Sequence, residues 1–92
     1  TEDELLTIVD YGGQVVDVTV EHPVYGELRG WLNIKSREDV HQFIRRLASS
    51  DAKPLLTLTD GVHLHKVEGA DATVLERVEK ALRAKGYLLE AR

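Results

Sequence analysis

Two runs of alternating apolar and polar residues, joined by a short turn, constrain the fold of this chain more than any other feature. The first is QVVDVTVEHP, residues 14–23, and the second is YGELRGWLNI, residues 25–34. Successive strand side chains point to opposite faces, and Pro23 ends the first run because it lacks a backbone donor. We therefore expect an antiparallel hairpin. Its apolar face would carry Val16, Val18, Val20, His22, Leu28, Leu32 and Ile34. Its other face would carry Asp17, Thr19, Glu21, Glu27, Arg29, Trp31 and Asn33.

Three segments have the spacing of amphipathic helices: residues 1–13, 36–50 and 71–86. Gly12-Gly13 and Gly86 are stop signals, and Ser36 is a typical N-cap with Asp39 as a weak capping-box partner. Residues 53–67 read as a second hairpin with a three-residue turn at 59–61, and 87–89 as a short final strand. This order predicts an α+β fold: a two-layer α/β sandwich, with an antiparallel sheet and its helices on one face.

Length and composition exclude several classes of protein. The 92 residues allow one domain, and no apolar stretch approaches the roughly 20 residues of a membrane span. Without cysteine, neither disulfides nor thiolate metal sites can form. A net charge of −4 argues against this segment binding nucleic acid by itself. We expect a cytoplasmic protein, and the absence of any Met suggests a fragment of a longer chain.

His63 and His65 are separated by one leucine, so on a strand both imidazoles point the same way. With the turn at 59–61, they would lie beside Thr57, on the face away from the aliphatic core. His-x-His can offer two nitrogens to one divalent metal, but a pair of tolerated polar groups is an equally open interpretation. Further ligands could come from His22, Glu4, Glu27 and Asp17.

Two of these candidates also have purely structural explanations. His22, at a strand end, could be satisfied by the backbone of the turn. Glu4 forms a capping box with Thr1 that requires no metal. No nucleophile elbow, phosphate loop or H-E-x-x-H helix is present. A small metal-dependent hydrolase and a plain dimerisation module remain alternatives.

Four stretches, LLTIVDYGGQVVDVTVEHPVYGEL, IKSREDVHQFIRRL, AKPLLTLTDGVHLH and ALRAKGYLL, together resemble the 3H domain over nearly the whole chain, residues 1–92. The 3H domain is the ligand-sensing part of bacterial repressors that respond to nicotinate and control NAD-precursor synthesis and uptake. The resemblance implies an HPr-like fold that binds one effector and one divalent metal. For such a regulator we expect a homodimer, because twofold dimers are the commonest oligomers. DNA would be contacted only through a helix-turn-helix domain outside this sequence.

The resemblance also implies a ligand set for a divalent transition metal such as nickel or zinc. His63 and His65 match the family's hairpin histidines, Glu4 matches the glutamate of its first helix, and a fourth ligand would lie upstream of Thr1. His22 is the remaining family histidine and is assigned to the pocket for nicotinate or a related pyridine. Tyr25, Arg29 or Trp31 could supply a stacking face or a counter-charge there.

Overall fold

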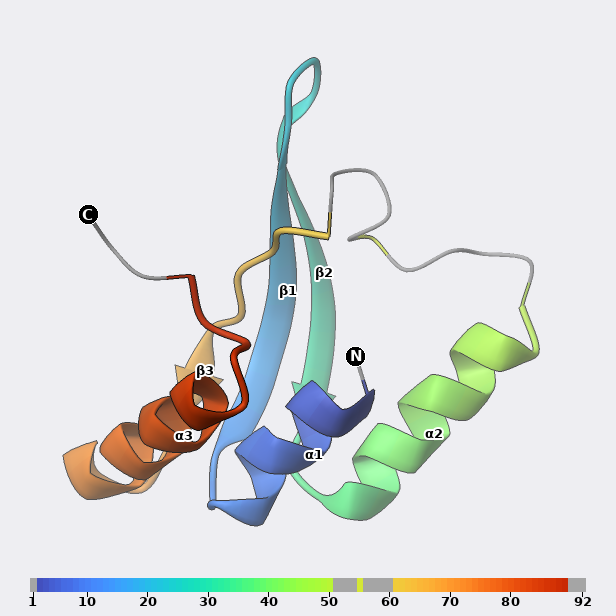
Figure 1. Cartoon of the computed structure of the whole chain (residues 1–92). Helices are drawn as coiled ribbons and strands as arrows, with labels where there is room; N and C mark the ends of the chain where they lie inside the picture. Colours follow the sequence, from blue (N-terminus) through green and yellow to red (C-terminus); the bar gives the residue numbers. More distant parts are fainter. Residues whose placement is uncertain (1, 51–54, 56–60, 90–92) are drawn as a thin grey trace.

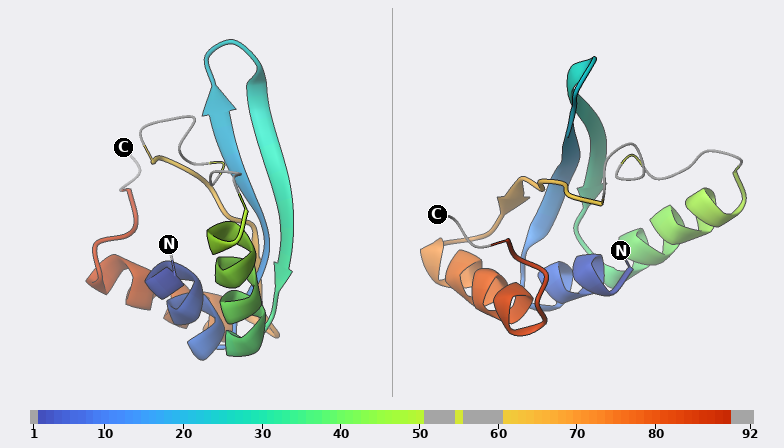
Figure 2. Two further views of the ribbon diagram at one scale, coloured as in Figure 1. Left: turned by 90° about the vertical axis from the view of Figure 1, so that its right-hand side faces the viewer. Right: turned by 45° about the horizontal axis from the view of Figure 1, so that its top comes forward.

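The computed structural model describes residues 2–50, 55 and 61–89. Within these residues, three helices and three strands follow in the order α1 (Glu2–Asp10), β1 (Gln14–His22), β2 (Gly26–Ile34), α2 (Arg37–Ala48), β3 (Val67–Glu68) and α3 (Ala72–Ala84). The strands form one antiparallel sheet in the order β2-β1-β3. Figure 2 shows the three helices on one face of this sheet. The predicted α+β architecture is confirmed, and the HPr-like topology stays a prediction.

The β1–β2 hairpin is longer than the helical layer beneath it. Its strands pair from Val15 opposite Ile34 to His22 opposite Gly26. In Figure 1 the far half of the hairpin stands clear of all three helices. Val24 and Tyr25 at its tip are 78% and 75% exposed. The molecule therefore has a packed end and a projecting end.

The simple alternation expected for β1 and β2 is interrupted near the packed end. Between the pairs Val15–Ile34 and Asp17–Trp31, β2 advances one residue more than β1. Asn33 absorbs this irregularity with a left-handed φ of 52°. At this end of β1, Val15 is therefore the residue in the core, whereas Val16, which was expected on the apolar face, is only half-buried. The predicted polar face is wrong at Asp17 and Thr19, which are both buried because the neighbouring segment 64–66 covers this edge of β1.

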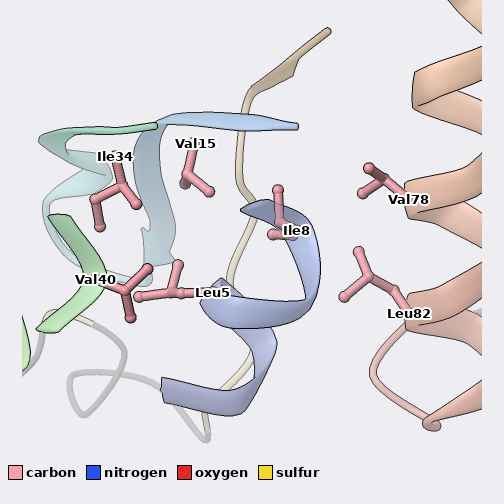
Figure 3. Close-up of a cluster of buried hydrophobic side chains, with 7 residues drawn as sticks. All are labelled: Leu5, Ile8, Val15, Ile34, Val40, Val78 and Leu82. Atoms are coloured by element: carbon pink, nitrogen blue, oxygen red, sulfur yellow. The ribbon is translucent and has the colours of Figure 1, made fainter. Parts of the chain in front are cut away.

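The core lies between the sheet and the helices, with α1 at its centre (Figure 3). Leu5 and Ile8 of α1 are fully buried and face side chains of both other helices. The chain turns tightly from α1 into β1, because Gly12 takes a φ of +94° and a Cβ on Gly13 would lie 2.8 Å from Ile8 Cγ2. The buried cluster comprises Leu5, Ile8, Val15, Ile34, Val40, Val78 and Leu82. This packing fixes α1, and with it Glu4, against the sheet.

The other two helices begin as their caps dictate. Ser36 Oγ accepts from the Asp39 N–H, as predicted, while the Asp39 carboxylate accepts from Lys35 N–H, one residue before the cap. Asp71 caps α3 by accepting from the Val74 N–H at 3.0 Å. Both helices are thus started by local side-chain acceptors that the sequence makes visible.

The predicted strand at residues 87–89 is wrong. Tyr87 N–H donates to the Leu82 carbonyl at the end of α3, and Leu88 packs against the core instead of joining the sheet. Of the second predicted hairpin, the first arm apart from Leu55 and most of the turn lie outside the described residues. The other arm does pair, but with β1: Leu64 bridges Thr19, and β3 follows at Val67.

Candidate metal centre

Three side chains from segments far apart in the sequence meet at one point of the packed end. Glu4 comes from the first turn of α1, and His63 and His65 come from the segment that runs along β1 before β3. Nε2 of each histidine lies 2.8 Å from Glu4 Oε1. The three side chains expose only 12–16% of their surface. The structure thus brings together the three residues that the sequence analysis named as metal ligands.

The other nitrogen of each ring is held by the backbone. His63 Nδ1 lies 2.7 Å from the Gly61 carbonyl, and His65 Nδ1 lies 2.6 Å from the Asp17 carbonyl. A carbonyl oxygen can only accept, so Nδ1 donates in both contacts and Nε2 is the atom directed to the shared point. The ring planes are inclined at 77° with their centroids 4.8 Å apart. Backbone acceptors behind Nδ1 are typical of histidines that ligate metals.

The histidines face the opposite side from the one predicted. Val62 and Leu64, expected on the aliphatic face, are 53% and 57% exposed, whereas both imidazoles point inward to α1. Alternation along the segment was therefore predicted correctly and its orientation was wrong. The buried Glu4 carboxylate gives the inward face its polar partner, which the hydrophobic pattern alone could not reveal.

The charges of the cluster reinforce each other. Burial by itself raises the pKa of Glu4, but hydrogen bonds from His63 and His65 outweigh it and lower that pKa from 4.5 to about 2. The hydrogen bond to Glu4 raises the pKa of His63 above 6.5, against the opposing effect of burial. A ring that donates to a carbonyl and a carboxylate at once carries the second proton. In the metal-free protein, the Nε2 proton of His63 therefore occupies a position that a cation could take.

The donor chemistry of the cluster suits a transition metal. The ligand atoms of Glu4, His63 and His65 all lie within 4.8 Å of one another. Two imidazoles and one carboxylate are a set that zinc, nickel and iron all accept, so it does not identify the metal. Three protein ligands leave at least one coordination position for water or another molecule. The residues present fit a divalent ion with an open site.

A cavity of about 670 Å³ adjoins the cluster. Glu4, His63 and His65 form one part of its wall, and apolar side chains from α1 and α3 form much of the rest. Among the described lining residues, the charged groups besides Glu4 are Glu21 and Glu79, and none is a lysine or arginine. The principal apolar lining residues are Ile8, Val67, Leu75, Val78, Leu82 and Leu88. Such a cavity accepts a small apolar or aromatic group beside a polar anchor.

The four residues predicted to bind the effector lie elsewhere in the described structure. His22 Nδ1 accepts from the backbone N–H groups of Val24 and Tyr25, at 3.1 and 3.2 Å, and its ring lies against that of Tyr25. Arg29 lies over the exposed Trp31 ring at 5.3 Å. None of the four is among the residues that line the cavity. Their assignment to a ligand site stays a prediction.

Of the remaining ligand candidates, Glu27 forms an exposed ion pair with Arg29 at 3.4 Å. Asp17 approaches the cluster through its backbone carbonyl and not through its carboxylate. The capping-box alternative for Glu4 involves Thr1, which lies outside the described residues.

Two contacts near the cavity were not predicted from the sequence. The Tyr87 hydroxyl donates to the Asp3 carboxylate, and Lys85 Nζ donates to Thr7 Oγ1 at 2.9 Å. These bonds hold the chain after α3 against α1, where Tyr87 and Leu88 complete the cavity wall. No local sequence signal could have paired residues 84 positions apart.

Fold and site together define a small α+β domain with a candidate metal centre beside an apolar cavity. The sequence matches the 3H domain family over residues 1–91. This chain therefore belongs to the 3H domain family.

Its curated relatives include transcription repressors. The chain is 47% identical over 89 residues to the probable transcription repressor NiaR of Thermotoga maritima, covering 97% of this chain and 51% of that protein. It is 42% identical over 90 residues to the transcription repressor NadR of Bacillus subtilis, covering 98% and 50% respectively. An uncharacterized protein of Methanothermus fervidus is 32% identical over 90 residues, 90% of this chain and 14% of that protein.

Both named relatives are transcription repressors, which supports a regulatory role for this 3H domain. The chain spans about half the length of these two repressors. In the part of the chain that the structure describes, no helix has the length and apolar character to cross a membrane.

Proposed function

We propose that this chain is the effector-sensing domain of a cytoplasmic transcription repressor, and that it binds one divalent metal through Glu4, His63 and His65. The observation that carries the proposal is the convergence of three ligand atoms from α1 and the segment before β3. The Nδ1 atoms of His63 and His65 donate to backbone carbonyls, and their Nε2 atoms are directed at one oxygen of the Glu4 carboxylate. The metal would supply a fixed positive charge at the cavity wall. Nickel and zinc are the ions we would test first.

The proposed effector is nicotinate or a related pyridine acid. A flat aromatic ring matches the apolar walls contributed by α1 and α3, and a carboxylate or pyridine nitrogen can bind an open coordination position. Without a metal, Glu4 is paired with the imidazoles, and the other charged residues of the cavity wall are Glu21 and Glu79, so the described lining offers an anion no lysine or arginine. We therefore propose that effector binding depends on the metal, because the open coordination position that would bind the pyridine nitrogen or the carboxylate exists only when the metal is bound.

We further propose that α1 transmits effector binding to DNA. Glu4 lies on its first turn, while Leu5 and Ile8 on the same helix pack into the core. An effector can shift a regulatory equilibrium only if it binds its two states unequally, so it must contact a part that moves. In this proposal a DNA-binding domain outside this chain, and a second protomer in a homodimer, respond to α1.

The experiment is calorimetry of the chain with nicotinate, before and after removal of metal by a chelator and after reloading with nickel. We expect heat of binding with the metal, none without it, and recovery on reloading. Benzoate lacks the ring nitrogen and nicotinamide lacks the charge, so together they identify which group the site requires. Equal nicotinate affinity with and without metal would contradict the proposal, as would no binding in either state.

A further inference from the structure

The strand pairing beside the candidate metal centre contains an irregularity at Asp17. Thr19 and Leu64 exchange both backbone hydrogen bonds, at 2.8 Å each. In a regular antiparallel ladder, the next such pair would be Asp17 and Lys66, two residues along each strand. The pairing that follows is instead Val15 with Val67. β1 thus contains one extra residue on this side, which is a β-bulge.

The side chain of Asp17 fills the gap that this bulge opens. Lys66 N–H donates to Asp17 Oδ1 at 3.0 Å, where a regular ladder would use the Asp17 carbonyl. The Lys66 carbonyl accepts from the Val16 N–H at 2.8 Å. The carboxylate thus takes over the acceptor role of its own backbone and leaves the carbonyl of Asp17 available.

That carbonyl is the group that accepts from His65 Nδ1, at 2.6 Å. Asp17 is only 3% exposed, and a buried carboxylate without partners would be costly. Here its oxygens contact the Lys66 N–H and Arg29 Nε, the latter at 3.4 Å. The burial of Asp17 is thus explained by the same contacts that release its carbonyl.

We propose that Asp17 is a positioning residue for the metal ligand His65. Its carboxylate stabilises the bulge by accepting from Lys66 N–H, which leaves the Asp17 carbonyl free to accept from His65 Nδ1. That hydrogen bond orients the His65 ring so that Nε2 points toward Glu4. His63 provides an internal comparison, because its Nδ1 is held by the Gly61 carbonyl, which does not involve Asp17. A test of this inference by metal affinity rests on the proposed function, whereas a test of the hydrogen bond between His65 and Asp17 does not.

The first test uses the metal-free 92-residue chain. The Nδ1 proton that His65 donates to the Asp17 carbonyl can be followed by NMR. We expect a scalar coupling across the hydrogen bond from His65 Nδ1 to the Asp17 carbonyl carbon, and a Nδ1 proton protected from solvent exchange. Absence of both signals in the unsubstituted chain would overturn the proposal without reference to any variant or metal.

The second test compares Asp17→Ala with Asp17→Asn, whose side-chain oxygen can still accept from Lys66 N–H. In Asp17→Ala we expect the His65 Nδ1 proton to lose its protection while that of His63 keeps it. Zn²⁺ affinity should fall about 10- to 100-fold, as is typical when a residue supporting a ligand is lost. The zinc affinity of Asp17→Asn should stay within about threefold of that of the unsubstituted chain, well below that range.

Equal losses in Asp17→Asn and Asp17→Ala would show that the negative charge matters and not the acceptor, and would overturn the proposal. Unchanged zinc affinity and ring protection in Asp17→Ala would also overturn it. If the unsubstituted chain binds no zinc, the proposed function fails, while the coupling and exchange measurements still decide the role of Asp17.

Discussion

The packed end and the projecting hairpin tip each hold a histidine motif, and they use it differently. At the packed end, His63 and His65 reach a carboxylate about 60 residues away, with all three side chains largely buried. At the tip, His22 bonds to the backbone of its own turn, beside the exposed Val24 and Tyr25. The first arrangement is assembled by the fold, whereas the second is assembled by four neighbouring residues.

This difference separates a structural histidine from a candidate ligand. His22 Nδ1 is committed as an acceptor to two N–H groups of the turn. At the packed end, the Nδ1 atoms donate to carbonyls and the Nε2 atoms point at a shared carboxylate, so exchanging protons for a cation would complete the site. Four predictions test this contrast, from the largest expected effect to the smallest.

The largest effect is expected on metal affinity. Glu4→Gln keeps the size of the side chain but removes the charged ligand, so Zn²⁺ affinity should fall by more than about 100-fold, beyond the loss typical of supporting residues. His22→Ala removes an imidazole from the other end and should leave zinc affinity unchanged. Titration calorimetry of both variants checks the contrast, and similar losses in the two would contradict it.

The same valine-to-alanine change should have unequal effects at the two ends. Val15 is 0% exposed in the core beneath the cluster, so Val15→Ala should lower the free energy of unfolding. The expected loss is about 2 kcal/mol, from lost burial and the cavity left behind. Val24 is 78% exposed, and Val24→Ala should change stability by less than about 0.5 kcal/mol. Denaturant unfolding measures both, and equal losses would refute the division into two ends.

A pH dependence should arise from the packed end of the metal-free chain. The lowered pKa of Glu4 stabilises the fold above pH 4.5, and this contribution is lost as the pH falls toward about 2. The raised pKa of His63 stabilises the fold below 6.5, and this contribution is lost as the pH rises through the folded-state pKa. The stabilisation by Glu4 and His63 together should therefore be greatest between pH 4.5 and pH 6.5.

The measurement is unfolding by denaturant across this pH range for the unsubstituted chain and Glu4→Gln. Their difference in free energy should form a maximum within the window and decline on both sides. A difference that does not vary with pH would show that Glu4 and His63 are not electrostatically coupled.

The smallest effect is expected on the melting temperature when a tyrosine hydroxyl is removed. The Tyr87 hydroxyl donates to Asp3, lowering the pKa of Asp3 and holding the chain after α3 against α1. Tyr87→Phe should slightly lower the melting temperature, because this contact is exposed to solvent. Tyr25→Phe at the hairpin tip should leave it unchanged. A larger decrease for Tyr25→Phe than for Tyr87→Phe would reverse the expected order.

Local features of the fold were predictable because local residues determine them. Ser36 starts α2, and Pro23 follows the last residue of β1. The alternation of residues 62–65 also placed both histidines on one face, and the family resemblance supplied Glu4 as their partner. These predictions required only neighbours in the sequence or a known pattern.

The features that failed depend on contacts between distant residues. The burial of Asp17 follows from a hydrogen bond to Lys66, 49 positions away, and no periodicity in β1 encodes it. Residues 87–89 look like a strand, yet Leu88 packs against the core as the chain leaves α3. The orientation of the histidines was reversed because it depends on where Glu4 lies, which only the packing of α1 fixes.

The central claim is that Glu4, His63 and His65 bind one divalent cation. An anomalous difference map from crystals of this chain grown with nickel tests it most directly. The account predicts a single strong peak about 2 Å from Glu4 Oε1 and from Nε2 of both histidines, the usual length of such bonds. A map with no peak between these three side chains, from crystals grown in a saturating concentration of nickel, would contradict it.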